Sequence, residues 1–293
     1  MIQGMQVILV TGSQGQLGSE LKELSASYPS YKFVFLSRKE APIGNNLALI
    51  ELFEKYRPVY FINCAAYTAV DKAEAEKEDA FTINGKAVGE LATLCRQYQT
   101  KLIHISTDYV FDGNATSPLK ESDKTDPVNQ YGASKLLGEQ LALRNNPDVL
   151  IIRTSWVYSF YGKNFVKTMM KLMSERSSLN VVGDQKGSPT YAADLAEAIM
   201  QIISSNKWVP GIYHYSNEGN ISWYDFALAI KEVTASTCQI NSIATSQFPT
   251  PAKRPAYSVM DKEKIRAAYN LQLKPWKESL KKCVSRLNSY KLN

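Results

Sequence analysis

Short apolar runs alternate with segments of helical periodicity through the first half of this chain. The apolar runs predict five β-strands, at Gln6–Val10, Lys32–Leu36, Tyr60–Asn63, Lys101–Ser106 and Val149–Arg153. Apolar residues at helical spacing predict helices between them, at Gln16–Ser27, Asn45–Tyr56, a long stretch ending near Tyr98, and Tyr131–Asn145. Strands that are nearly continuous apolar runs are typical of a sheet that is buried on both faces. The alternation therefore predicts an α/β fold with a doubly wound parallel sheet of the Rossmann type.

After Arg153 the alternation loosens, and loops rich in aromatic residues and glycine interrupt it. These loops are expected at Trp156–Asn164, Gly183–Thr190, Tyr213–Trp223 and Pro249–Pro255. We expect this half to form a smaller, discontinuous C-terminal substrate-binding lobe over the carboxyl ends of the strands, where open α/β sheets bind ligands. The expected division is a main domain of residues 1–155 and about 190–212, where a helix near Asp194–Ser204 returns to the sheet, and a lobe of residues 156–189 and 213–293.

The bulk composition is that of an ordinary globular protein, with 44% hydrophobic and 21% charged residues. The chain contains no apolar run of about 18 residues, so no membrane-spanning helix is expected. The segment Met1–Val10 lacks the pattern of a signal peptide, so we expect a cytoplasmic protein. The net charge of +6 comes from scattered basic residues, which does not indicate nucleic-acid binding but does suit a phosphorylated ligand.

Cysteine and histidine give no sign of a metal site. No two cysteines form a CxxC pair, and histidine is too rare to complete a zinc site. We expect these side chains to pack in the core or at the surface. They are Cys64, Cys95, Cys238, Cys283, His104 and His214.

The first predicted strand leads directly into the segment Thr11–Gly18, which has the spacing G-x-x-G-x-x-G. Glycines at this spacing permit a tight turn, a close approach of the backbone to a pyrophosphate, and close packing of helix on strand. The helix that follows offers free N–H groups and a partial positive charge to phosphates. The segment therefore predicts a dinucleotide cofactor. The residues expected to contact it are Gly12, Gly15, Gln16, Leu17 and Gly18.

The end of the second strand bears on the choice between NADH and NADPH. An acidic residue there would bind the ribose 2′-OH, whereas an arginine accommodates a 2′-phosphate. Here Ser37 and Arg38 follow the strand, and the first acid is Glu40. NADPH is therefore expected, and NADH is the alternative if Arg38 is only a solvated loop charge. After the third strand, Ala65 and Ala66 would let the backbone lie against the adenosine half of the cofactor, unless they are packing alanines.

Tyr131 and Lys135 lie four residues apart, on the same face of one predicted helix. A phenol with a pKa near ~10 exchanges protons poorly at neutral pH unless a cation stabilises its phenolate, and Lys135 supplies that cation. Thr107, at the end of the fourth strand, can bond a substrate carbonyl oxygen beside the tyrosine. An acid, an orienting hydroxyl and a hydride donor then converge on one carbon. These three residues are the predicted catalytic residues of a carbonyl reductase.

These motifs resemble those of the extended short-chain dehydrogenase/reductases. Longer stretches resemble one family among them, the dTDP-4-dehydrorhamnose reductases, over nearly the whole chain. The stretches are Thr68–Glu74, Ser106–Gly113, Pro127–Lys135, Arg153–Tyr158, Asp184–Thr190 and Thr250–Pro255. The resemblance implies NADPH-dependent reduction of the C4 ketone of dTDP-4-dehydrorhamnose (dTDP-4-dehydro-6-deoxy-L-mannose) to dTDP-L-rhamnose, a precursor of surface polysaccharides.

The resemblance also implies roles for individual residues. Thr107 would polarise the ketone, Tyr131 would donate the proton, and Lys135 would lower the pKa of the tyrosine. The implied substrate contacts are Thr107, Asp108, Tyr109, Trp156 and Arg254, the last to the diphosphate. Further implied cofactor contacts are Tyr67, Thr68, Tyr131 and Lys135. Trp156 as a core aromatic and Arg254 as a surface ion pair are the alternatives.

Some members of the family bind a magnesium ion at a dimer contact through a glutamate early in the first helix. Glu20 fits that place, but no acidic partners for it are evident in the sequence. The predicted site therefore contains no metal, and a magnesium ion and a homodimer are left as open alternatives.

Two other functions also stay open. One is a nucleotide-sugar epimerase or dehydratase of the same superfamily. Tyr109 follows Asp108 where a dehydratase has a second acid, and Arg38 argues against an epimerase that retains NAD. The other is a non-catalytic subunit that resembles the regulatory subunit of methionine adenosyltransferase. The complete set of Thr107, Tyr131 and Lys135 favours catalysis over that binding role.

Overall fold

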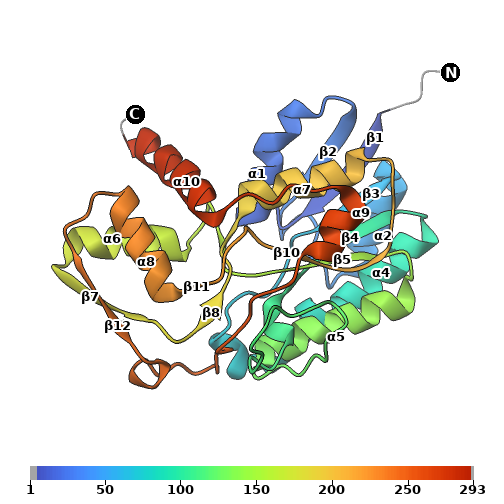
Figure 1. Ribbon diagram of the computed structural model, residues 1–293. Helices are drawn as coiled ribbons and strands as arrows, with labels where there is room; N and C mark the ends of the chain where they lie inside the picture. The colour runs from blue at the N-terminus through green and yellow to red at the C-terminus, as the bar shows by residue number, and fades with distance from the viewer. Residues whose placement is uncertain (1–4, 292–293) are drawn as a thin grey trace.

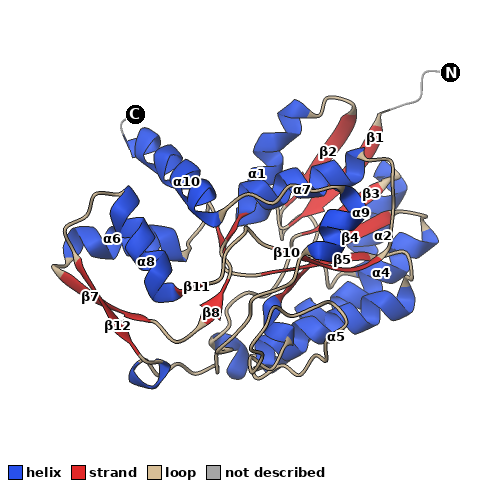
Figure 2. Ribbon diagram, viewed as in Figure 1, coloured by secondary structure: helices blue, strands red, loops and turns tan. Residues whose placement is uncertain are grey.

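The computed structural model describes residues 5–291, so the expectations for residues 1–4 and 292–293 lie outside the described residues. Its central sheet is six-stranded and wholly parallel, with the order β10-β5-β4-β3-β1-β2 (Figure 2). The strands are β1 (Gln6–Thr11), β2 (Tyr31–Leu36), β3 (Tyr60–Asn63), β4 (Lys101–Thr107), β5 (Leu150–Thr154) and β10 (Gly211–Tyr215). This confirms the predicted fold class. The strand order reverses between β1 and β3, and at such a reversal open α/β sheets bind their ligands in a crevice outside the carboxyl ends of the strands.

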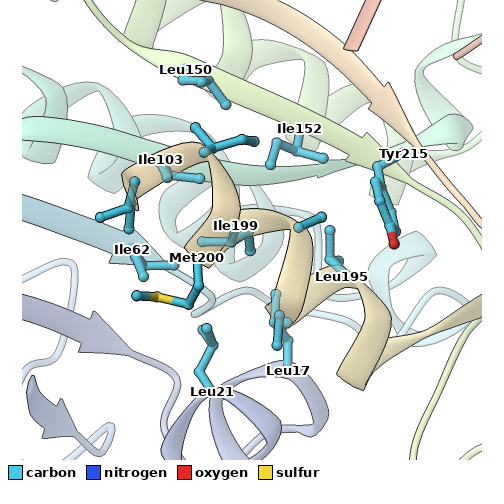
Figure 3. Packing of buried hydrophobic residues seen from close by; sticks show 14 of the residues in the cluster. Leu17, Leu21, Ile62, Ile103, Leu150, Ile152, Leu195, Ile199, Met200 and Tyr215 are labelled. Carbon is cyan, nitrogen blue, oxygen red and sulfur yellow. The ribbon is translucent and has the colours of Figure 1, made fainter. Parts of the chain in front are cut away.

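Helices cover both faces of the sheet because successive strand side chains point to opposite sides. One face carries α1 (Gln16–Leu24), α7 (Ala192–Ser204) and α9 (Glu263–Tyr269). The other carries α2 (Asn46–Tyr56), α4 (Ala87–Gln97) and α5 (Gln130–Asn145). Figure 3 shows how side chains of α1 and α7 meet those of the strands on the first face: Leu17, Leu21, Leu195, Ile199, Met200, Ile62, Ile103, Leu150 and Ile152.

A second group of elements lies to one side of the sheet (Figure 1) and has its own hydrophobic core. Its helices are α6 (Phe165–Glu175), α8 (Trp223–Val233) and α10 (Trp276–Lys291). Its short strands are β6 (Val157–Tyr158), β7 (Ser178–Val182), β8 (Lys186–Gly187), β9 (Thr190–Tyr191), β11 (Ile221–Ser222) and β12 (Gln239–Ile243). They pair as β7 with β12, β8 with β11 and β6 with β9. We refer to this group as the lobe.

Parts of two segments that were expected in the lobe belong with the sheet instead: residues 213–215, and α9. The expected loop Tyr213–Trp223 begins inside β10, which pairs with β5. Ile265 and Tyr269 of α9 pack in the same core as the central strands. The sequence did not predict β10 because the strand begins with a glycine and contains a histidine, so it lacks a continuous apolar run. His214 is nevertheless completely buried. The chain therefore passes from sheet to lobe and back more often than the sequence indicated.

The expected long helix before Tyr98 is also interrupted. It consists of η2 (Lys72–Glu74), α3 (Lys77–Phe81), a π-helical turn η3 (Thr82–Lys86) and α4. The interruption contains a buried asparagine, Asn84, whose side chain contacts Tyr67 in the loop after β3. Within residues 5–291, no helix is both long enough and apolar enough to cross a membrane.

Candidate active site

The loop after β1 closes against the end of β3. Gly12 has a φ of +66°, and a Cβ at this position would lie 2.7 Å from the backbone of Cys64 and Ala65. A Cβ on Gly18 would collide with the Gly12 carbonyl oxygen, so α1 begins in direct contact with the turn. Gly15 caps α1, and the described residues provide neither a side-chain cap nor an acid in its first turn. The start of α1 therefore presents N–H groups and a positive dipole end to an anionic ligand.

Gln16 and Leu17, the first residues of α1, can serve such a ligand through their backbone. The Gln16 side chain points to the lobe, where it donates to the Val157 carbonyl oxygen at 3.3 Å and accepts from Asn164 at 3.0 Å. Leu17 is buried in the core under the sheet. Both predicted contacts are therefore restricted to N–H groups.

Ser37 and Arg38 follow β2 at the same edge of the sheet. Glu40 accepts from the Ser37 N–H at 2.8 Å, and its hydrogen bonds with Ser37 lower the pKa of this exposed carboxyl. Arg38 is exposed and forms no hydrogen bond or ion pair with any residue that the structure describes. The guanidinium of Arg38 is therefore available to a phosphate, while Glu40 is occupied within its own loop.

The predicted contacts Ala65, Ala66, Tyr67 and Thr68 form the loop that follows β3. Asn84 holds this loop: its Oδ1 accepts from the Tyr67 N–H at 2.8 Å, and its Nδ2 donates to the Tyr67 carbonyl oxygen at 3.0 Å. Nδ2 also donates to the Ser134 hydroxyl of α5 at 3.0 Å. Sequence reasoning missed Asn84, and the only available signal was a polar residue inside an apolar helical segment. Its π-helical turn is a feature that is frequent at functional sites.

Thr107 ends β4 and Tyr131 lies in the first turn of α5, and the Thr107 hydroxyl accepts from the Tyr109 N–H at 3.2 Å. The ring of Tyr109 packs edge-on against the ring of Tyr131, with 5.8 Å between the centroids. Burial raises the pKa of Tyr131 to about 12. The Thr107 hydroxyl acts to lower it, and the Asp108 carboxylate raises it further. The structure thus brings together the predicted acid, the predicted orienting hydroxyl and two predicted substrate contacts.

Lys135 lies one turn after Tyr131, but its ammonium is directed at β4. Nζ donates to the Ile105 carbonyl oxygen at 2.6 Å and lies 3.4 Å from Nε2 of His104. In this arrangement β4 engages the ammonium, and burial is the largest influence on the pKa of Tyr131. The expected lowering of that pKa by Lys135 stays a prediction. Burial also lowers the pKa of Lys135 itself to about 8, which leaves it mostly protonated at neutral pH.

Asp108 carries an incompletely bonded carboxylate at this edge. Oδ1 accepts from the Thr107 hydroxyl at 3.0 Å, whereas the buried Oδ2 has no hydrogen-bond partner among residues 5–291. Burial raises the pKa of Asp108 to about 6, although the hydroxyls of Ser258 and Thr107 act to lower it. An unpaired buried carboxylate oxygen is costly, so it is typical of a group that is kept for a ligand.

Trp156 lies just beyond β5 on the edge that carries Thr107, because Thr154 pairs in register with Thr107. Its φ of +47° is unusual for a residue other than glycine, and such strain clusters at functional sites. The indole stacks on Trp223, with 3.6 Å between the ring centroids. A Cβ on Gly187 would lie 2.6 Å from the Trp156 ring. Trp223, which sequence reasoning missed, therefore fixes the plane of the predicted substrate contact.

Arg254 forms an ion pair with Asp71, which is the alternative that the sequence left open. Its Nη1 also donates to the Ala252 carbonyl oxygen at 2.8 Å. The next carbonyl along, that of Lys253, accepts from Asn129 at the start of α5 at 2.8 Å. The segment 250–255 thus lies against the catalytic helix. A contact between Arg254 and a diphosphate requires Arg254 to exchange Asp71 for the ligand.

Glu20, the candidate magnesium ligand, has protein partners instead. The Ser159 hydroxyl donates to Oε1 at 2.5 Å, and Arg286 donates to Oε2 at 2.9 Å. A guanidinium at this position supplies the positive charge that a cation would bring, so these residues do not fit a metal. In the described part of the chain, no group of three or more His, Cys, Asp or Glu side chains could hold a metal ion.

The chain matches the family model described as the RmlD substrate binding domain over residues 5–289. A dTDP-4-dehydrorhamnose reductase of Aggregatibacter actinomycetemcomitans is 40% identical over 287 residues, which cover 94% of this chain and 98% of the relative. This chain belongs to the dTDP-4-dehydrorhamnose reductase family. The spore coat polysaccharide biosynthesis protein SpsK of Bacillus subtilis is 42% identical over 97% of this chain and 99% of that protein.

Solved structures agree with this membership. A dTDP-4-dehydrorhamnose reductase from Bacillus anthracis, determined in complex with NADP, has a TM-score of 0.92 and 38% identity, covering 96% of this chain and 99% of that chain. The resemblance read from the sequence is confirmed, and so is the assignment of the chain to the oxidoreductases. The contacts of individual residues with cofactor and substrate stay predictions.

Proposed function

We propose that this protein uses NADPH to reduce the C4 ketone of dTDP-4-dehydrorhamnose to dTDP-L-rhamnose, as a step toward a surface polysaccharide, in the cytoplasm. The observation that carries the proposal is that Tyr109 links Thr107 and Tyr131 at the sheet edge that also holds the glycine loop: its N–H donates to the Thr107 hydroxyl at 3.2 Å, and its ring packs on that of Tyr131. Family membership supports the substrate, since relatives of about this similarity bear the name of the reaction. The NADP complex of the Bacillus anthracis protein supports the cofactor.

The dinucleotide would bind at the carboxyl ends of β1 and β3. The turn at Gly12 and the uncapped start of α1 would hold the pyrophosphate, and the loop Ala65–Thr68 would lie against the nucleotide. Arg38 would bind the 2′-phosphate, because no described acidic residue engages its guanidinium. Bound NADPH would supply the hydride to C4.

The remaining chemistry belongs to the side chains of the chain. Tyr131 Oη gives its proton to the ketone oxygen as C4 gains the hydride, so the carbonyl becomes a secondary alcohol. Lys135 has two N–H groups beyond the one that it gives to Ile105, and in the proposed mechanism these would serve the phenolate and a ribose hydroxyl. The Thr107 hydroxyl, which donates to Asp108, can turn to the ketone oxygen.

On the substrate side, the free Oδ2 of Asp108 can accept a hydrogen bond from a sugar hydroxyl. The ring of Tyr109 lies next to that of Tyr131 and would border the sugar. Trp156, held on Trp223, would contact the sugar-nucleotide. Arg254 would take the diphosphate in a bidentate contact after it releases Asp71.

The test is to incubate the purified protein with NADPH or NADH and a panel of nucleotide-linked 4-keto-6-deoxy sugars. We expect NADPH to be oxidised with dTDP-4-dehydrorhamnose, at a higher rate than NADH, and dTDP-L-rhamnose to form, as identified by NMR. An epimerase or dehydratase would form a product without net NADPH consumption. A regulatory subunit would show no turnover and would co-purify with a synthetase. Either result overturns the proposal. Light scattering in the same buffer measures whether the protein is a homodimer.

A further inference from the structure

A chain of buried polar side chains crosses the sheet beneath Tyr131, and the proposed chemistry does not use it. Glu139 follows Lys135 by four residues as Lys135 follows Tyr131, so the three side chains share one face of α5. Arg153 of β5 donates from Nε to Oε1 of Glu139 at 3.0 Å and from Nη2 to Oε2 at 2.7 Å. The Ser106 hydroxyl of β4 also donates to Oε1, at 2.5 Å. Glu139 is 1% exposed and Arg153 is 2% exposed, so water does not screen this pair.

At the far end, His214 of β10 contributes no charge. Its Nδ1 lies 3.1 Å from the carbonyl oxygens of Leu119 and Asp261, which can only accept, so Nδ1 carries the ring proton. Nε2 then accepts from Nη1 of Arg153 at 3.5 Å. Burial, with the nearby Arg153, lowers the pKa of His214 to about 3, so the ring is neutral at physiological pH.

At the near end, His104 of β4 is neutral as well. Oδ1 of Asn63 accepts from the Thr11 hydroxyl at 2.8 Å and from the Ala65 N–H at 3.2 Å, so the donor Nδ2 faces Nδ1 of His104 at 3.1 Å. His104 therefore carries its proton on Nε2, beside Nζ of Lys135. Burial and Lys135 hold the pKa of His104 well below its usual range. His104 offers Lys135 neither negative charge nor an acceptor.

None of the other titratable groups described near α5 places a negative charge beside Lys135. Burial raises the pKa of the Cys64 thiol, which faces Lys135, to about 12. The Asp108 carboxylate acts on Tyr131. Glu74 accepts from the Gln130 N–H at the start of the helix, at 2.8 Å, and Asn84 meets the helix at Ser134. Among the described residues, Glu139 is thus the carboxylate that acts on Lys135, and it lies between two cations, Lys135 and Arg153.

We propose that Glu139 and Arg153 are positioning residues that set the charge beside Tyr131. Glu139 keeps Lys135 protonated in its buried site. Arg153 neutralises Glu139, so that the group of three keeps a net charge of about +1 to stabilise the phenolate that forms when Tyr131 releases its proton. The inference rests on the proposed function where it invokes the phenolate. The charge state of Lys135, in contrast, is a property of the folded protein without substrate.

The deciding measurement is the pKa of Lys135, followed by NMR of the full chain labelled with ¹³C at lysine Cε. The Lys135→Met variant identifies the signal by its disappearance. Glu139→Gln keeps the size of the side chain and an acceptor for Ser106, and should lower the pKa of Lys135 by about 1–3 pH units because an opposite charge is lost. Arg153→Met leaves the Glu139 carboxylate uncompensated and should raise the pKa of Lys135. A general loosening of the site would not lower the pKa of Lys135 in one variant and raise it in the other.

The pH dependence of kcat provides a second test, because the two variants should change it in different ways. In Glu139→Gln, kcat should fall by about 10–100-fold above the lowered pKa of Lys135 and recover toward the wild-type value at lower pH. In Arg153→Met, kcat should fall by a similar factor at every pH, because the positive excess beside the phenolate is gone. The KM for NADPH should stay within about threefold in both variants, since neither residue lies at the glycine loop.

A matched control is available in the lobe-side network around Asp194, which is 3% exposed and accepts from Lys274 and from Asn217, each at 2.8 Å. Asp194→Asn removes a buried carboxylate from an ion pair whose lysine is partly exposed, so it should lower stability without moving the pKa of Lys135 or the pH profile. If Glu139→Gln does not fold, the double variant with Arg153→Met removes the pair together and should fold. It should place the pKa of Lys135 between those of Glu139→Gln and the wild type.

An unchanged pKa of Lys135, or a shift of the same sign in both single variants, would show that the proposal is wrong. Absence of turnover by the wild type with every sugar would contradict the proposed function instead. The NMR titration needs no substrate, so the two failures are distinguishable.

Discussion

Arg254 and Asp71 form two parallel hydrogen bonds, from Nη1 to Oδ1 and from Nη2 to Oδ2, each 2.8 Å long. The pair joins the segment after β3 to the segment before α9, and the Ala252 N–H adds a bond to Asp71 at 3.2 Å. A guanidinium fork matches a carboxylate and a phosphate equally well. Asp71 therefore orients the Arg254 guanidinium so that its two parallel N–H groups could bind a diphosphate in place of the Asp71 carboxylate.

We predict that Arg254→Lys raises the KM for the nucleotide sugar by about 10–100-fold, because a lysine cannot make the bidentate contact. The KM for NADPH should not change. Steady-state kinetics with each substrate varied in turn provide the measurement.

Asp71→Asn is the matched control for that prediction. It removes the carboxylate that competes for Arg254 while it keeps the side-chain size, so the KM for the nucleotide sugar should stay the same or fall. If both variants raise this KM equally, the pair serves only to fasten the segment 250–255, and Arg254 does not bind the diphosphate.

Tyr131→Phe should reduce kcat by about 10²–10⁴-fold, the usual effect of losing a positioned acid, and should leave NADPH binding largely intact. NADPH fluorescence measures binding, and stopped-flow absorbance measures the chemical step. Tyr109→Phe is the neighbouring control, since it removes a hydroxyl from the adjacent ring without touching the proposed proton donor. Full turnover by Tyr131→Phe would remove Tyr131 from the mechanism.

Arg38→Ala should raise the KM for NADPH by about 10–100-fold, because a charge-assisted contact to the 2′-phosphate is lost. The KM for NADH, which lacks that phosphate, should be unaffected. Lys39→Ala removes the next exposed cation and tests whether general positive charge is enough. Equal losses with NADPH and NADH would mean that Arg38 does not read the 2′-phosphate.

Asp108→Asn should stabilise the protein above about pH 6. Burial places the folded-state pKa at about 6, above the ordinary value of 3.8, so the folded protein holds a proton that the unfolded chain has released. The free energy of unfolding therefore falls as the pH rises between these values, and stays low above them. The variant escapes this cost, and should gain about 3 kcal/mol at neutral pH and nothing below about pH 4.

Urea unfolding at several pH values measures this gain. Asp112→Asn is the control, because hydrogen bonds with Asn114 lower the pKa of this exposed carboxyl. A gain for Asp108→Asn that does not depend on pH would contradict the electrostatic explanation.

The sequence predicted the first five strands of the sheet within about two residues, because each is a short apolar run between turn residues. It did not predict β10, whose burial depends on packing against β5 and on the bonds of His214 with distant carbonyl groups. The glycine loop and the pair Tyr131–Lys135 were also predicted, because residue spacing is enough to recognise them. Residues that act locally in the chain are the ones that a single sequence reveals.

What the sequence could not give was the direction of side chains. Lys135 was expected to face Tyr131, but an acceptor on β4 takes its ammonium. The expectation that His104 and His214 simply pack in the core gave their burial but not their tautomers, which depend on the partners Asn63 and Leu119. These contacts join residues that are far apart in sequence, so the periodicity of apolar residues along the chain does not predict them.

The edge position of β10 has a consequence for biosynthesis of the protein. A growing chain that ends before Gly211 has completed β5, yet the partner that should cover its outer edge has not been made. In such a nascent chain the outer edge of β5 is unpaired, and an unpaired strand edge that begins with three apolar residues, Leu150, Ile151 and Ile152, is a site for wrong pairing with other chains. Translation pauses and premature stops between β5 and β10 therefore expose this protein to aggregation and to chaperone binding.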